Sequence, residues 1–235
     1  MSLKIVFKYT TRSRRSNFLR GIDSIINNLS DKVNYHIFTT IDTDDDKMRP
    51  LPEIIGNHTY IAGVSKSKVD AINRDMDYIN SNYDWDMLIN MSDDVCFVKK
   101  GFDNIIREEF LLHQLERNFD EHLSNDEISL NTNDLVLHFP DGNRSDLLTV
   151  SIIGRDYYNR DNYIYNPEYK SLFCDNEAME VAKMRGCYKF IDKVIFNHLH
   201  PAYNKGIFDA QYQHTESFSN EDRLTYERRK ANGFN

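Results

Sequence analysis

Two adjacent carboxylates, Asp93 and Asp94, lie between two mostly apolar runs in the segment from Ile89 to Val98. Burying both charges at the end of a strand is costly unless another group compensates them. A hard divalent cation that also holds a diphosphate is a natural compensator, because such cations prefer oxygen ligands. The pattern Ser92-Asp93-Asp94 therefore predicts a metal and diphosphate site. The alternative is an aspartate pair that caps the next turn.

Two histidines, His198 and His200, follow another predicted strand in the segment Asn197-His198-Leu199-His200-Pro201. If one of them meets the aspartate pair in space, the carboxylate and imidazole ligands would suit Mn²⁺ or Mg²⁺. A lone histidine is more often structural, and His200 could sit in a turn because it precedes a proline. Spacing alone leaves both interpretations open.

A third acidic group, Asp175 and Glu177, opens a predicted helix. Acidic side chains at a helix start commonly cap free N–H groups and complement the helix dipole. One of these carboxylates could instead act as a general base that takes the proton from an attacking hydroxyl. The two interpretations have equal support from the spacing.

Basic and hydroxyl side chains follow the first predicted strand, in the run Thr10-Thr11-Arg12-Ser13-Arg14-Arg15. Such groups at a helix start can receive a phosphate or a nucleotide, but they can also form an ordinary basic cap.

An acidic loop from Asp42 to Asp46 follows the second predicted strand. Asp42 is placed to accept from a nucleobase imide or a ribose hydroxyl, with a solvated acidic turn as the alternative. The sequence disfavours a calcium loop, because Lys47 stands where such a loop requires glycine and prolines follow.

Alternating strands and helices are predicted to position these groups. The apolar periodicity predicts strands over 4–9, 34–40, 59–63 and 86–91, and helices over 18–29 and 69–79, the second capped by Ser65. This order indicates an α/β fold with a mostly parallel sheet and helices on both faces. Ligands of such sheets collect beyond the carboxyl ends of the strands, where the polar segments lie.

The second half is less regular. The sequence predicts helices over 102–115, 176–185 and 220–230, strands over 135–139, 147–153 and 188–197, and a loop-like polar stretch over 116–133. Five tyrosines lie close together and are candidates for acceptor recognition or for packing a lobe onto the sheet: Tyr157, Tyr158, Tyr163, Tyr165 and Tyr169.

The bulk composition favours a single folded domain over residues 1–235. The chain is 40% hydrophobic, and its three cysteines show no CxxC pairing, so neither a disulfide framework nor a zinc cluster is expected. The apolar runs are shorter than the roughly 18 residues of a membrane span, so we expect a cytoplasmic protein with no transmembrane segment. The net charge of -8 disfavours non-specific DNA binding.

In this order, the polar segments resemble the motifs of the GT-A glycosyltransferases, and especially the inverting family 2 group. The resemblance implies a Rossmann-like GT-A fold with a nucleotide-sugar-binding half over 1–98. The acceptor-binding and catalytic half, including an irregular sub-lobe, would cover 99–235. It also implies that the nucleotide sugar is held by a set of residues from the first half: Thr10, Arg12, Asp42, Lys66, Lys68, Asn73 and Asp93.

The same resemblance implies metal and catalytic roles. Asp94 matches the last aspartate of the DXD-type motif, and His198 matches the late metal-binding histidine, with His200 as its substitute. Asp175 matches the base of the ED-type pair, with Glu177 in reserve. The chain departs from the family where Ser92 replaces the leading aspartate of the motif and Cys174 replaces the glutamate of the ED pair.

The resulting expectation is a Mn²⁺- or Mg²⁺-dependent transfer of a sugar, from a UDP-sugar in preference to others, to an acceptor hydroxyl. The acceptor could be a glycan, a lipid-linked molecule, a protein or a modified nucleobase. Two alternatives stay open: a nucleotidyltransferase that makes nucleotide sugars, and a non-catalytic binding protein on a degenerate GT-A fold. The nucleotidyltransferase would normally carry a glycine-rich first loop, and residues 10–15 contain no glycine.

Overall fold

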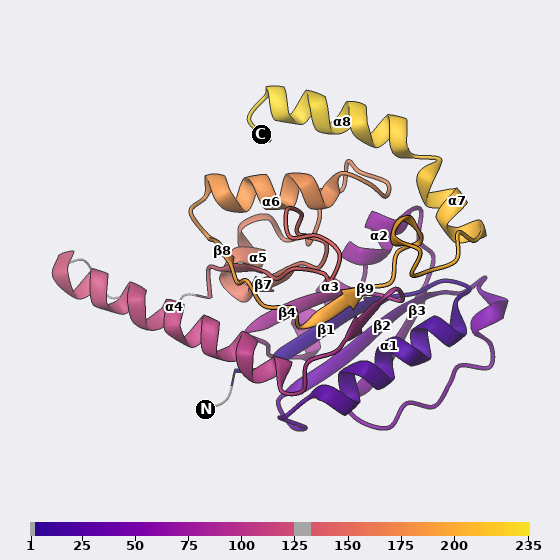
Figure 1. The fold of residues 1–235 in the computed structure, drawn as a ribbon, viewed down its shortest axis with the longest axis horizontal. Helices are drawn as coiled ribbons and strands as arrows, with labels where there is room; N and C mark the ends of the chain where they lie inside the picture. The colour runs from indigo at the N-terminus through magenta and orange to yellow at the C-terminus, as the bar shows by residue number, and fades with distance from the viewer. Residues whose placement is uncertain (1–2, 125–132) are drawn as a thin grey trace.

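A seven-stranded mixed sheet forms the centre of the molecule (Figure 1). The computed structural model describes residues 3–124 and 133–235. The strands of this sheet lie in the order β3-β2-β1-β4-β7-β6-β8. Their bounds are β1 (Ile5–Thr10), β2 (Tyr35–Asp42), β3 (His58–Gly63), β4 (Met87–Ser92), β6 (Val136–His138), β7 (Ile152–Gly154) and β8 (Tyr188–Phe190).

The first four strands are parallel, so their carboxyl ends meet at one edge. In the register of the sheet, Thr10 at the end of β1 lies beside Thr40 of β2 on one side and Ser92 of β4 on the other. β7 is antiparallel to both β4 and β6, and β6 pairs in parallel with β8. The prediction of a mostly parallel sheet is confirmed, with β7 as the antiparallel exception.

Helices cover both faces of this sheet (Figure 1). The α-helices are α1 (Arg15–Asn28), α2 (Lys68–Asn73), α3 (Met76–Asn82), α4 (Phe102–Ser124), α5 (Arg155–Asp161), α6 (Cys174–Met184), α7 (Ala210–Glu216) and α8 (Ser219–Ala231), with short 3-10 turns η1 (Asp46–Met48) and η2 (Pro201–Tyr203). None of the described helices has the length and apolarity needed to cross a membrane.

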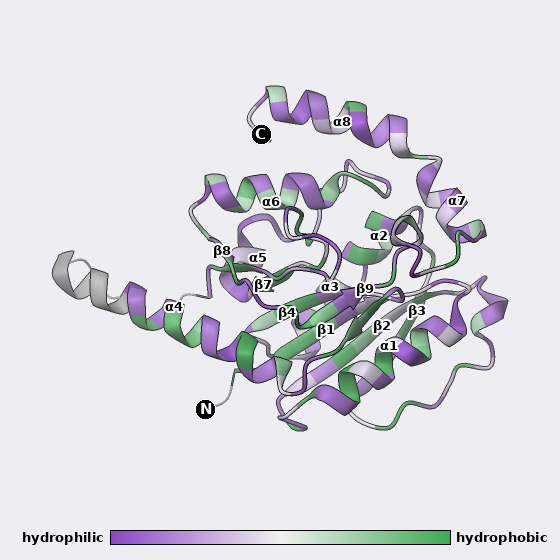
Figure 2. Cartoon of the chain, viewed as in Figure 1, coloured by the Kyte–Doolittle hydropathy of each residue, from purple (hydrophilic) through white to green (hydrophobic). Residues whose placement is uncertain are grey.

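Strand alternation divides the apolar side chains into two cores, and Figure 2 shows the hydrophobic residues concentrated on the central strands. Phe7 and its neighbours pack with α1 and the start of α4 on one face. Val6 and its neighbours pack with α2, α3, α5 and α6 on the other face. Four of the five clustered tyrosines belong to this second core, which supports the packing role for Tyr157, Tyr158, Tyr165 and Tyr169.

Several predicted elements differ from the structure. The helix predicted over 69–79 is two helices, because Asp75 adopts a left-handed conformation with φ of 74° between them. Its cap is Ser67, whose side chain accepts from the Asp70 N–H, and not Ser65. The strand predicted over 188–197 is two short strands, β8 and β9 (Phe196–His198).

The fourth helix is also longer than predicted. The sequence indicates a loop from residue 116, whereas α4 continues to Ser124 and projects from the body of the molecule (Figure 1). The sequence indicated a loop there because the stretch is mostly polar and charged.

The C-terminal helix α8 is fastened to the loop before α6 by one buried carboxylate. Asp222 is completely buried and accepts the backbone N–H groups of Lys170, Ser171 and Leu172 at 2.7–2.8 Å. Arg229 of the same helix makes a second tie through two hydrogen bonds to buried Glu177. These contacts fix the loop at 170–172, which borders the cleft described below.

We expect Asp222→Ala to lower the free energy of unfolding by roughly 2–4 kcal/mol, because three buried N–H groups lose a charged acceptor. The neighbouring exposed residue supplies a matched control, and Glu221→Ala should change the value by less than about 0.5 kcal/mol. Urea denaturation followed by circular dichroism measures both. Equal unfolding midpoints for the two variants would contradict this anchoring role.

Candidate functional site

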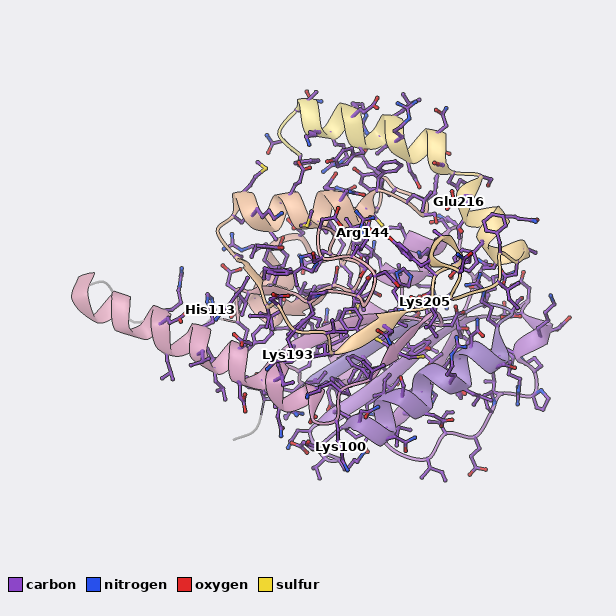
Figure 3. All side chains as sticks on the ribbon, in the orientation of Figure 1. Lys100, His113, Arg144, Lys193, Lys205 and Glu216 are labelled. Carbon is purple, nitrogen blue, oxygen red and sulfur yellow. The ribbon has the colours of Figure 1, made fainter. Side chains whose placement is uncertain are left out.

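Two adjoining cavities lie at the carboxyl edge of the parallel strands. The first has a volume of about 250 Å³ and the second about 370 Å³. They share a wall of seven residues: Thr10, Lys68, Ser92, Asp94, Ser171, Tyr212 and Thr215. Arg144 and Glu216, labelled in Figure 3, border the second cavity from the loop after β6 and from α7. The shared wall makes the two cavities parts of one cleft.

Asp94 lies at the junction of the cavities. Its Oδ1 accepts from Ser92 Oγ at 2.5 Å, and its Oδ2 accepts from the Tyr212 hydroxyl at 2.6 Å. The same Oδ2 lies 3.3 Å from Nε2 of His198. Burial alone would raise the pKa of the Asp94 carboxyl, but His198, the charge of Lys68 and Ser92 hold it well below its usual value.

The approach of His198 to Asp94 results from a second, two-stranded sheet. β5 (Val95–Phe97) pairs antiparallel with β9, and this register sets His198 opposite Val95. The backbone N–H of Leu199 donates to the Asp94 carbonyl at 2.7 Å, which fixes the two segments at this point. The predicted meeting of a late histidine with the aspartate pair is therefore present for His198.

Asp141 supports His198 from the other side. Its Oδ2 lies 3.4 Å from His198 Nδ1, and its backbone carbonyl accepts the His198 N–H at 2.8 Å. Burial alone would lower the pKa of His198, but the two carboxylates raise it to about 9. A carboxylate behind a histidine that faces a ligand site is a common arrangement at metal centres, where it orients the imidazole.

Asp94 and His198 fit a divalent cation as a pair of ligands. Their 3.3 Å separation allows both atoms to reach one ion, and Mg²⁺ and Mn²⁺ typically complete their shells with phosphate oxygens and water. Among the described residues, no three His, Cys, Asp or Glu side chains converge as a metal cage. The arrangement therefore suits an ion bound jointly by protein and diphosphate.

Asp93 faces a different set of partners. It accepts from Thr11 Oγ1 at 2.9 Å and from Arg14 at 3.1 Å. Burial and the charge of Asp94 raise the pKa of Asp93, while Arg14 and Thr11 oppose the shift. Arg14 also forms a two-pronged ion pair with Asp209, at 2.8 and 2.6 Å. It thus joins the aspartate pair to the segment that begins α7.

The first cavity is lined by all of the predicted nucleotide-binding residues except Asn73. Thr10, Arg12, Asp42, Lys66 and Lys68 all line it. The carboxylate of Asp42 forms ion pairs with Arg12 at 2.6 Å and with Arg74 at 3.2 Å. Arg12 also contacts exposed Asp44 at 2.8 Å, so it is the more accessible of the two arginines. This leaves an oriented carboxylate at the end of β2.

Asp175 and Glu177 lie in different environments, although both belong to the first turn of α6. Asp175 lines the second cavity, and burial raises the pKa of its carboxyl. Glu177 does not line either cavity of the cleft. It is buried against Arg229, at 2.8 and 2.9 Å, and Tyr169, at 2.7 Å. The structure therefore brings only Asp175 to the cleft.

Two further predicted site residues serve structural contacts. The amide of Asn73 binds the backbone of Ile164 and Tyr165, and Asn73 does not line the cleft. His200 borders the second cavity, but its Nδ1 accepts the N–H of Ala202 at the start of η2. His200 thus occupies the turn that the following proline indicated.

Four residues that contact side chains of the cleft were not assigned roles from the sequence: Arg14, Arg74, Asp141 and Tyr212. Asp141 follows β6 in the turn around Gly142, so its position at a strand end was the available signal. Arg14 lies in the basic run after β1. Tyr212 stands in a polar segment without a motif, and nothing in the local pattern indicates its contact with Asp94.

Comparisons with known proteins identify the fold. No family model matches the chain, and no curated protein matches it by sequence. Among solved structures, S. aureus TarS aligns with a TM-score of 0.52 at 13% identity, over 83% of this chain and 36% of TarS. TarS 1-349 in complex with UDP gives 0.50 at 14% identity, over 83% of this chain and 60% of that one.

An archaeal structure gives a similar alignment. The mannosyltransferase PcManGT from Pyrobaculum calidifontis, in complex with GDP-Man and Mn²⁺, has a TM-score of 0.50 at 8% identity, over 83% of this chain and 55% of its own. The chain thus spans less than two thirds of each of these neighbours. The α/β architecture, the cleft at the strand ends and these alignments together show that the chain has the GT-A fold of glycosyltransferases.

Proposed function

We propose that this protein is a metal-dependent glycosyltransferase that moves a sugar from a nucleoside-diphosphate sugar to an acceptor hydroxyl. The observation that carries the proposal is the order of groups along the cleft. Asp42 and Arg12 lie in the first cavity, Asp94 lies at the junction, and Asp175 lies in the second cavity. A nucleotide, a diphosphate and a sugar, followed by an acceptor, fit this order.

The first cavity is assigned to the nucleotide. Asp42 would accept a hydrogen bond from the base or the ribose. Arg12 would give up part of its contact with Asp44 to bind the ligand, because the side chains of Arg12 and Asp44 are both solvent-accessible. The UDP complex of the TarS neighbour supports UDP as the nucleotide. A UDP-sugar is therefore the favoured donor.

The junction is assigned to the diphosphate. When bound by Asp94 and His198, Mn²⁺ or Mg²⁺ would neutralise the charge that develops on the leaving nucleotide. Lys68 borders both cavities, and its positive charge acts on both Asp94 and Asp175. It is thus placed to stabilise the same leaving group without a metal contact.

Asp175 is assigned as the general base. A carboxyl with a raised pKa accepts a proton more readily than an ordinary aspartate does, which suits removal of the acceptor's hydroxyl proton. The hydroxyl oxygen would then attack the anomeric carbon as the bond to the diphosphate breaks. A single displacement of this kind inverts the anomeric configuration.

The metal assignment is tested by hydrolysis of UDP-sugars, in which water serves as the acceptor. We expect Mn²⁺-dependent release of UDP, lost with a chelator and restored by added Mn²⁺. Asp94→Ala and His198→Ala should each reduce it by more than about 100-fold, because even outer-shell partners of metal ligands contribute about 10- to 100-fold. Exposed Asp84 offers a control, and Asp84→Ala should retain full hydrolysis.

Two results would contradict this proposal. Binding of UDP-sugars without turnover would identify a non-catalytic binding protein. Formation of a nucleotide sugar from a nucleoside triphosphate and a sugar phosphate would identify a nucleotidyltransferase.

The base assignment predicts a pH dependence. Asp175 must be deprotonated to act, so hydrolysis should fall as the pH falls through its raised pKa, at a higher pH than an ordinary aspartate would give. Asp175→Asn should lower turnover by roughly 10²- to 10⁴-fold. Glu180 lies on the same helix but outside the cleft, and Glu180→Gln should leave the profile unchanged. An unaltered pH profile in Asp175→Asn would exclude this residue as the base.

A further inference from the structure

Three residues that line the second cavity each carry a buried neutral polar atom without a hydrogen-bond partner within the described part of the protein. The atoms are Asn90 Oδ1, Thr149 Oγ1 and Ser171 Oγ. Asn90 is only 8% exposed and Ser171 only 3% exposed. A buried polar atom without a partner is energetically unfavourable, so three at one cavity indicate a place where a ligand supplies the missing bonds.

The backbone around these atoms is fixed. Asn90 lies within β4, and its N–H donates to the Ser151 carbonyl at 2.9 Å. Ser171 is held by Asp222, which accepts its N–H at 2.8 Å. The Thr149 N–H donates to the Leu147 carbonyl at 2.9 Å. The three side chains are thus presented by positioned elements, as recognition of a specific ligand requires.

The position of the group along the cleft indicates which part of a ligand it contacts. Ser171 borders both cavities, together with Asp94, whereas Asn90 and Thr149 border only the second, together with Asp175. Asn90 and Ser92 alternate along β4 and so face the same side of the sheet. The group therefore lies between the proposed diphosphate site and the proposed base, where the sugar to be transferred must lie.

The chemistry of the three atoms defines the sugar. Each hydroxyl can donate or accept one hydrogen bond with a sugar hydroxyl, while an amide oxygen can only accept. A sugar carboxylate cannot donate to the amide oxygen, and it would also face the carboxylate of Asp175. The site thus favours a neutral, hydroxyl-bearing sugar over a uronic acid.

We propose that Asn90, Thr149 and Ser171 form the subsite that recognises the hydroxyl groups of a neutral donor sugar and sets the choice of sugar. This inference rests on the proposed function, because it takes the first cavity as the nucleotide site. It goes beyond that function by naming specificity residues that lie outside the metal and base motifs.

The test compares the affinity of UDP with that of UDP-glucose, UDP-N-acetylglucosamine and UDP-glucuronic acid, by calorimetry in the presence of Mn²⁺. In the unmodified protein, at least one neutral UDP-sugar should bind more tightly than UDP, and UDP-glucuronic acid should not. Asn90→Ala, Thr149→Val and Ser171→Ala should each reduce that advantage by about 3- to 10-fold. Asn90 and Thr149 border only the second cavity, so Asn90→Ala and Thr149→Val should leave UDP affinity unchanged.

Thermal unfolding separates recognition from folding. Because the Thr149 and Ser171 hydroxyls lack partners within the described structure, Thr149→Val and Ser171→Ala should unfold at or above the temperature of the unmodified protein. Ser24 provides a control outside the cleft, since its hydroxyl donates to the Gly21 carbonyl at 2.7 Å and accepts the Phe97 N–H at 3.0 Å. Ser24→Ala should lower stability and leave the preference for the sugar unchanged.

The outcomes distinguish the inference from the function on which it rests. If UDP binds, but the three variants keep the full preference for a neutral sugar, the subsite is wrong and the proposed function stands. A preference for UDP-glucuronic acid, or no gain of any UDP-sugar over UDP, would also overturn the subsite. If neither UDP nor any UDP-sugar binds, both proposals fail.

Discussion

The pairing of β5 with β9 is the contact on which the arrangement of the cleft depends. It brings a segment from the end of the chain to the end of β4 and sets His198 between the carboxylates of Asp94 and Asp141. Two buried carboxylates so close to each other repel, and an imidazole between them reduces that repulsion. A divalent cation beside Asp94 would have the same effect, so the geometry that stabilises the fold also favours a metal site.

The C-terminal segment completes the cleft. Arg14 spans Asp93 and Asp209, and its guanidinium lies 4.1 Å from the ring centre of Tyr212. Tyr212 in turn donates to Asp94. The start of α7 is therefore tied to the aspartate pair both directly and through Arg14. The contacts of Arg14 and Tyr212 with the buried pair Asp93 and Asp94 thus connect segments that are far apart in the sequence. They hold α7 where it lines both cavities.

The sequence predicted the first half of the fold and its strand-end groups well, because local patterns decide them. Apolar periodicity defined β1, β2 and β4, and parallel strands then require their ends to share an edge. The role of Tyr212 was not predictable, because it depends on a contact across 118 residues. The continuation of α4 was missed for a different reason: the sequence after residue 115 is mostly polar and charged, which favoured a loop.

Spacing in the sequence could not distinguish Asp175 from Glu177 as the base, whereas the geometry of α6 does. Both are acidic residues in one helical turn, so the sequence supported either as the base. Residues two apart in a helix point about 200° from each other, so only one of them can face the cleft. Arg229 holds Glu177 on the side of α6 that faces away from the cleft, through two hydrogen bonds. The ion pair between Glu177 of α6 and Arg229 of α8 thus orients α6 so that Asp175 faces the second cavity. There the raised pKa of Asp175 suits proton transfer.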